Sequence, residues 1–358
     1  MRLPAPLICL LTIGALIGCG TPGAPLPPSL GIPKPVNDLQ AVRKGVNVTL
    51  SWSAPTDTND GALLRKQGKM VVSRTVSDDS AAGRYPQTVA EVVLPPALTE
   101  PEPAPPTAKD SLGSLLDSGG DFAVYTVVSK NNQGRAAGPS NAASIPLVPT
   151  PPAPARLQAI AVPLGISLSW EQAWPPENRS HLTAQYAWRI MRREQGTQAP
   201  VTVKQVGLSN EATAVVDTSI EWQKHYDYWI TPITLWQGTG KKGVVEGDDS
   251  PVAAVFANDT FPPDPPLGLQ AVYSGLANQP FIDLAWTPNS EPDLAGYNVY
   301  RHTGDEPPVK INSSVVKTSS FRDTMVQPGM KYFYSVSAVD VRNNESPRSA
   351  ETSESVPQ

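Results

Sequence analysis

The residues that could do chemistry are few and widely spaced in this chain of 358 residues. No two of its three histidines are four residues apart, and no cysteine lies near them, so the usual zinc ligand set is missing. The patterns G-x-S-x-G and H-E-x-x-H do not occur in the sequence. The histidines are His181, His225 and His302. The sequence therefore predicts neither a metal site nor a nucleophilic active site.

Two short motifs begin like ligand-binding loops but lack the residues that such loops need. Residues 238–243, "GTGKKG", have the glycine spacing of a dinucleotide loop, yet no helical period follows them. Residues 57–61, "DTNDG", start like a calcium loop, but Ala62 replaces the required glycine and Gly68 replaces the required glutamate. We interpret the first as the loop and hairpin between the last two strands of the second domain, and the second as a turn. No cofactor is expected.

A glycosidase remains the alternative from the enzyme class. Such an enzyme needs two carboxylates that face each other across a cleft. Glu171, Asp248 and Asp249 fall at one end of the second domain, but nothing in the sequence specifies a cleft between them. An unrecognised carbohydrate-active enzyme would show clustered polar groups with shifted pKa values in such a cleft.

Composition narrows the class of protein. The formal net charge of −5 and the absence of a long basic run argue against a nucleic-acid partner. The 40 prolines argue against a mainly helical chain, because proline breaks helix interiors. With 40% hydrophobic and 17% charged residues, the chain is globular and long enough for two or three domains.

The N-terminus has the pattern of a secretory signal. Arg2 precedes the apolar residues 7–17, a run too short to span a membrane. Residues 16–19, Leu-Ile-Gly-Cys, resemble the lipobox of bacterial lipoproteins. The resemblance implies cleavage before Cys19 and acylation of this cysteine, for example with palmitate, so that two or more acyl chains anchor the chain in a membrane. A plain signal peptide with an unrelated cysteine is the alternative.

The surroundings of Cys19 are consistent with a lipid anchor. The other cysteine, Cys9, lies within the predicted signal peptide at 1–18, so the mature chain has no intramolecular disulfide partner for Cys19. Residue 20 is glycine, whereas an aspartate there tends to retain lipoproteins in the inner membrane. The resemblance thus implies the outer membrane, at its periplasmic or its surface face. Residues 19–35 form a proline-rich tether that would reach about 50 Å in polyproline II form.

A domain-sized unit is repeated three times. Its first signature runs from Leu-Gln-Ala to a tryptophan, with alternating apolar residues typical of a β-strand. The tryptophans are 118 and 116 residues apart. A strand that ends in arginine and a later strand with Tyr-x-aliphatic follow in each copy. The signatures are residues 39–52, 157–170 and 269–286; the arginine strands are 70–74, 188–192 and 297–301; the tyrosines are Tyr125, Tyr228 and Tyr334.

These features resemble fibronectin type III domains. The third copy matches best, through "PDLAGYNVYR" at 292–301 and "QPGMKYFYSVSAVD" at 327–340. The resemblance implies an all-β fold of three tandem immunoglobulin-like β-sandwiches after the signal peptide and tether. The expected domains are 36–148, divergent and with a proline-rich insertion at 94–110, then 149–258 and 261–357.

The resemblance also implies a tyrosine corner, in which a tyrosine hydroxyl bonds to the backbone a few residues upstream. Tyr332 and Tyr226 occupy this position in the third and second copies. The first copy has Ala123 there, or Phe122 if the alignment slips by one residue. Neither side chain has a hydroxyl, so we expect the first domain to lack the bond.

Six of the eight tryptophans lie in the second domain, and three of these are candidate binding residues. Trp229 alternates with inward-facing neighbours and should face outward. Trp174 comes just after the second strand and Trp236 just after the sixth, whose loops share one end of the sandwich in this family. Exposed aromatic side chains there would bind sugars or a protein. Alternatively, they pack on a neighbouring domain or cover core edges.

The sequence therefore predicts a non-catalytic, lipid-anchored protein of the cell envelope. Its role would be binding or spacing through tandem sandwiches, with the membrane, an envelope protein or a polysaccharide as partner. The alternative within the binding class is an accessory subunit of an envelope export or assembly complex.

Overall fold

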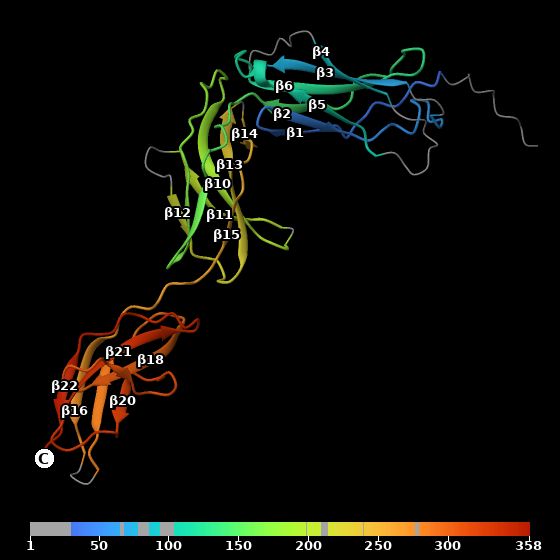
Figure 1. Ribbon diagram of the computed structural model, residues 1–358. Coiled ribbons are helices and arrows are strands. Elements are labelled where there is room, and N and C mark those ends of the chain that lie inside the picture. Colours follow the sequence, from blue (N-terminus) through green and yellow to red (C-terminus); the bar gives the residue numbers. More distant parts are fainter. Residues whose placement is uncertain are drawn as a thin grey trace, which may run out of the picture. The chain divides into compact units, whose positions relative to one another are not determined.

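The computed structural model describes residues 30–64, 68–77, 86–93, 104–197, 199–208, 214–238, 240–275 and 279–358. The predicted signal peptide, Cys19 and residues 94–103 of the predicted insertion lie outside these ranges. The chain separates into two compact units: one holds most of the first sandwich, the other the second and third (Figure 1). Within the described ranges, no helix is long and apolar enough to cross a membrane.

The first sandwich is built from two sheets. In one, β2 lies between β1 and β5; the other has the order β4-β3-β6-β7. Residues 107–110, expected in the insertion, belong to β5. A short 3₁₀ helix, Gly113–Leu115, follows β5. The strands are β1 Gln40–Lys44, β2 Asn47–Ser51, β3 Lys69–Ser77, β4 Gln87–Val93, β5 Thr107–Ser111, β6 Phe122–Ser129 and β7 Ala143–Pro146.

The second sandwich repeats this plan, with two longer strands, β10 and β13. Its sheets have the orders β8-β9-β12 and β11-β10-β13, and β13 also pairs with both β14 and β15. β13 has 14 residues, whereas its counterparts β6 and β21 have 8 and 10. The strands are β8 Gln158–Val162, β9 Gly165–Ser169, β10 Thr183–Glu194, β11 Val201–Gly207, β12 Ala214–Asp217, β13 His225–Gly238, β14 Lys241–Glu246 and β15 Ala253–Phe256.

The third sandwich has the sheets β16-β17-β20 and β19-β18-β21-β22. Its core gathers apolar side chains from both sheets, as does the core of the second sandwich. The strands are β16 Leu267–Tyr273, β17 Ile282–Thr287, β18 Leu294–His302, β19 Val309–Lys310, β20 Ser320–Asp323, β21 Lys331–Asp340 and β22 Thr352–Ser355.

The repeat in the sequence corresponds to the buried core that each sandwich forms. Trp52, Trp170 and Trp286 are buried at the end of the second strand of each sandwich. The apolar residues two and four positions before them are buried as well, because successive side chains of a strand point to opposite faces of its sheet. Val46, expected on the same face in the first copy, is instead 38% exposed in the turn before β2. The predicted all-β fold of immunoglobulin-like sandwiches is confirmed.

The tyrosine corner is present where the sequence places it. The backbone N–H of Gln327 donates to the hydroxyl of Tyr332 at 2.9 Å. In the second sandwich, the N–H of Glu221 donates to the hydroxyl of Tyr226 at 2.9 Å. The first sandwich has Ala123 at this position, buried and without a hydroxyl. The difference predicted among the three copies is confirmed.

Candidate functional site

An arginine, an aspartate and a tyrosine meet in each sandwich, and we call each such group a clasp. The arginine lies on the third strand, the aspartate on the fifth and the tyrosine on the sixth. In the third sandwich, Nη1 of Arg301 lies 2.8 Å from Oδ2 of Asp323, and the hydroxyl of Tyr334 donates to the same oxygen at 2.9 Å. The counterparts are Arg74, Asp110 and Tyr125, and Arg192, Asp217 and Tyr228.

Each clasp joins the two sheets of its sandwich. The aspartate belongs to the sheet that contains the first two strands of its sandwich, and the arginine and tyrosine belong to the facing sheet. The side chains of Asp217 and Asp323 are 1% and 3% exposed, so these carboxylates are nearly removed from water. A buried carboxylate is tolerated because its lone pairs are satisfied by charged and neutral donors. The arrangement stabilises the fold and leaves the carboxylate no free oxygen for acid–base chemistry.

The electrostatics of the second clasp favour the ionised aspartate. Burial raises the pKa of Asp217, but hydrogen bonds from Ser219 and Tyr228 and the charge of Arg192 outweigh it, so the pKa is lowered overall. Burial raises the pKa of Tyr228, and the charge of Asp217 raises it further. At neutral pH the clasp therefore contains a carboxylate, a guanidinium and a neutral phenol.

The lowered pKa of Asp217 predicts a loss of stability in acid. A group whose pKa is lower in the folded state stabilises the fold above its unfolded pKa, and this contribution disappears as pH falls through the folded pKa. We expect the urea midpoint of the second sandwich to fall below about pH 4. The measurement is hydrogen exchange of the β13 amides in urea between pH 6 and 3. The variant Asp217→Asn should be less stable at pH 6 and show a shallower fall; a fall as steep as in wild type would contradict the assignment.

The repeat signatures in the sequence contain the arginines and tyrosines of the clasps but not the aspartates. Asp217 and Asp323 each lie 11 residues before the clasp tyrosine, and Asp110 lies 15 before it. The shared separation in the second and third copies is a signal that an aligned repeat contains. The separation between aspartate and tyrosine is longer in the first copy, so a comparison of all three copies does not reveal the shared spacing.

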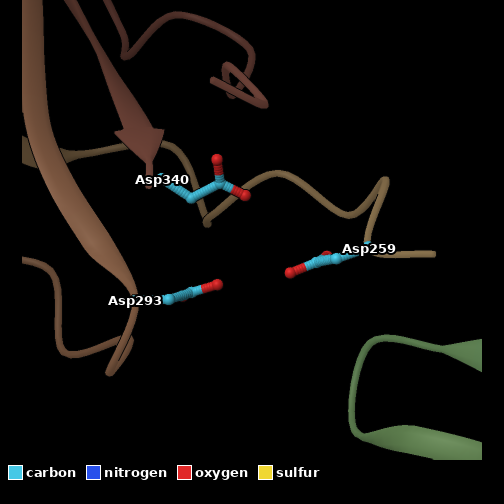
Figure 2. A group of neighbouring side chains, drawn as sticks. All are labelled: Asp259, Asp293 and Asp340. Carbon is cyan, nitrogen blue, oxygen red and sulfur yellow. The ribbon is translucent and has the colours of Figure 1, made fainter. Parts of the chain in front are cut away.

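Three aspartates converge near the start of the third sandwich (Figure 2). Asp259 lies in the segment between β15 and β16, Asp293 precedes β18, and Asp340 ends β21. One carboxylate oxygen from each lies within 4.8 Å of the others, a spacing that a metal ion would fit. Among the described residues this is the one acidic group with that geometry.

Protein groups, however, already satisfy these carboxylates. Nη1 of Arg342 lies 3.0 Å from Oδ2 of Asp259 and 3.9 Å from Oδ2 of Asp293. The oxygens of Asp340 accept from the backbone N–H groups of Arg342 and Asn344 and from the Asn344 amide, each at 2.8 Å. The Asn344 amide also donates to the backbone oxygen of Asp259 at 3.2 Å. We interpret the role of the cluster as structural: it attaches the segment before β16 to the third sandwich.

Of the three candidate tryptophans, Trp229 lies on the outer face of its sheet, as alternation predicts. Tyr228 and Ile230 beside it are fully buried, whereas Trp229 is half-buried. Trp229 pairs with Met191 on the neighbouring strand β10, and the guanidinium of Arg193 lies 5.8 Å from the centre of the Trp229 ring. These neighbours cover part of the indole, so Trp229 presents only part of its ring to a ligand.

Trp174 and Trp236 lie on segments that meet at one end of the second sandwich. Trp174 is 55% exposed, in the loop before β10. The expectation that Trp236 follows the sixth strand is wrong, because β13 continues to Gly238 and Trp236 pairs with Ala184 and Gly243. Pairing with β10 and β14 satisfies the extra backbone groups, which is why the strand does not end earlier. The loop that carries Trp174 ends beside this extension, where Thr183 pairs with Gln237.

The remaining motifs are structural. Gly238 ends β13 and pairs with Lys241, the first residue of β14, so the predicted hairpin is confirmed, although its second strand is an additional strand and not the last one, β15. Residues 57–61 form the predicted turn, in which the N–H of Thr58 donates to the carbonyl of Ala62 at 2.8 Å. His225 stacks on Phe256, and Nε2 of His302 lies 2.7 Å from Oε2 of Glu351.

Comparisons with known proteins find relatives for parts of the chain. No family model matches it. A stretch of 71 residues is 38% identical to an amylopullulanase of Thermoanaerobacterium saccharolyticum; it covers 20% of this chain and only 5% of that enzyme. The solved FN1–FN3 domains of chicken CNTN1 are 14% identical over 91% of this chain and all of theirs, with a TM-score of 0.26. An Fn3-like protein from Clostridium thermocellum is 33% identical over 27% of this chain and 97% of its own, with a TM-score of 0.24.

Proposed function

We propose that this chain is a non-catalytic, lipid-anchored protein of the cell envelope, held in the outer membrane through Cys19. Its three sandwiches serve as a binding surface or spacer, and the proline-rich residues 19–35 set their distance from the membrane. The partner is an envelope protein or a polysaccharide.

The buried carboxylates support the proposal that the chain is not a catalyst. In the described residues, the buried carboxylates of Asp217, Asp323 and Asp340 are used in hydrogen bonds within the fold. A catalytic carboxylate needs a free oxygen facing a substrate cleft. The match to an amylopullulanase spans too little of that enzyme to carry over its activity.

The anchor rests on the sequence alone. The run Leu-Ile-Gly-Cys closes an apolar segment that follows Arg2, and small or proline residues dominate the next positions. Two or more acyl chains hold a protein stably in a bilayer, since each buried methylene contributes about 0.8 kcal/mol.

The test is metabolic labelling of cells with an alkyne analogue of palmitate. We expect strong labelling of the wild-type chain and loss of at least nine tenths of the label in Cys19→Ala. Cys9→Ala provides the matched control, because it removes the other cysteine of the chain and should leave labelling unchanged. Equal labelling of wild type and Cys19→Ala would refute the anchor.

A further inference from the structure

In the described residues, the second sandwich has a hairpin extension that the first and third sandwiches lack. β10 has 12 residues and β13 has 14, whereas the counterparts of β10 in the first and third sandwiches have 9 each. The additional strand β14 pairs with the end of β13, from Ile233↔Glu246 to Gly238↔Lys241 (Figure 1). A segment beyond the shared fold is where one copy of a repeat can hold a function of its own.

The tip of this extension contains a pocket of about 510 Å³. Strand register arranges its side chains in two rows on one face of β10, β13 and β14. One row is polar and the next row mixes an amide with two apolar side chains. Trp236 and Gly243, paired in the row between, border the same pocket. The rows are Thr183, Gln237 and Lys242, and Gln185, Leu235 and Val244.

Trp236 fits closely against Gly243 on the opposite face of the sheet, because successive side chains of a strand alternate between its faces. A Cβ added at Gly243 would lie 2.9 Å from Nε1 and 3.2 Å from Cε2 of Trp236, so only glycine leaves room for the indole. The indole is half-buried. Its position is therefore set by the hairpin, on the face away from the two rows that line the pocket.

The polar groups of the pocket are available to a ligand. In the described part of the chain, the side chains of Gln185, Gln237 and Lys242 are exposed and have no hydrogen-bond or ion-pair partner. The two amides offer donors and acceptors, and the hydroxyl of Thr183, which donates to the carbonyl of Gln237 at 3.0 Å, can still accept. Lys242 is the one charged group in the lining.

We propose that this pocket binds an acidic saccharide chain. Closely spaced hydroxyls of a sugar match the amides and the hydroxyl, and its C–H face matches the apolar Leu235 and Val244. A carboxylate on the sugar pairs with Lys242 in a charge-assisted hydrogen bond. No carboxylate lines the pocket to repel it. The inference deepens the proposed binding role and rests on it, but it does not depend on the anchor.

The test is calorimetric titration of the full-length protein in detergent with two hexasaccharides of equal length and linkage. One is an α-1,4-linked galacturonate hexamer and the other is the uncharged maltohexaose. We expect the galacturonate hexamer to bind at least ten-fold more tightly, and the difference to shrink at high salt because salt screens the exposed charge. Failure here leaves palmitate labelling unaffected, so the two proposals fail separately.

Adjacent lysines give a matched pair of variants. Lys242 lines the pocket and Lys241 does not, although both are exposed on β14. We expect Lys242→Ala to weaken binding of the galacturonate hexamer about ten-fold and Lys241→Ala to change it less than two-fold. Gln185→Ala should weaken binding of the same hexamer several-fold. Equal effects of the two lysine variants, equal affinity for both sugars, or binding to anionic vesicles in place of either sugar would overturn the proposal.

Discussion

Replacing Asp323 by alanine is expected to lower the free energy of unfolding of the third sandwich by about 3–5 kcal/mol. The substitution leaves Arg301 without its carboxylate and the buried hydroxyl of Tyr334 without an acceptor. It also removes the link from β20 to β18 and β21, which lie in the facing sheet. A charge left partly buried and unpaired costs more than the loss of an exposed ion pair, because water cannot replace the missing partner.

Asp283→Ala is the matched control in the same sandwich. Asp283 pairs with Arg322 at 2.7 Å, but both side chains are well exposed, at 38% and 57%. We expect this variant to lose about 0.2–1 kcal/mol. The measurement is hydrogen exchange of the β18 and β21 amides in the full-length protein, which reports on the third sandwich separately. Similar losses in the two variants would show that the clasp does not hold the sheets together.

Replacing Arg342 by alanine is the second large effect that we expect, at about 3 kcal/mol in the third sandwich. Arg342 lies between Asp259 and Asp293, and the side chain of Asp259 is only 4% exposed. Without the guanidinium, three carboxylates within 4.8 Å of one another face each other with less compensating charge. Their repulsion should loosen the segment that precedes β16.

Hydrogen exchange of the amides of residues 257–267 measures this loosening. Arg348→Ala is the control, since Arg348 is exposed and contacts the ring of Tyr300 at 5.4 Å. It should cost less than about 1 kcal/mol. Arg342→Lys keeps the positive charge and should retain part of the protection. Unchanged exchange of residues 257–267 in Arg342→Ala would contradict the structural role of the aspartate cluster.

Local patterns were sufficient to predict the sandwiches. Alternation placed Val48 and Leu50 beside Trp52 in one core, and the same rule placed Ile282 and Leu284 beside Trp286 in another. The tyrosine corner was implied by the resemblance to fibronectin type III domains, and its partner lies five residues from Tyr332 in the chain. Features that depend on residues close together in the sequence can be predicted from the sequence alone.

Features that depend on contacts between distant strands could not be predicted from local sequence patterns. The partner of Asp323 is Arg301, 22 residues away, and the partner of Asp259 is Arg342, 83 residues away. Nor does the local sequence around Trp236 show that β13 continues through it, because pairing with β14 and β10 extends the strand. Such ion pairs and strand extensions depend on which strands become neighbours in the folded chain.

The central claim is that Cys19 is the first residue of the mature chain and carries its lipid. The most direct measurement is mass spectrometry of the N-terminal peptide of the full-length protein purified from membranes. We predict a peptide that begins at Cys19, with a diacylglyceryl group on sulfur and an acyl chain on the amine. A peptide that begins elsewhere, or an unmodified Cys19, would contradict the account.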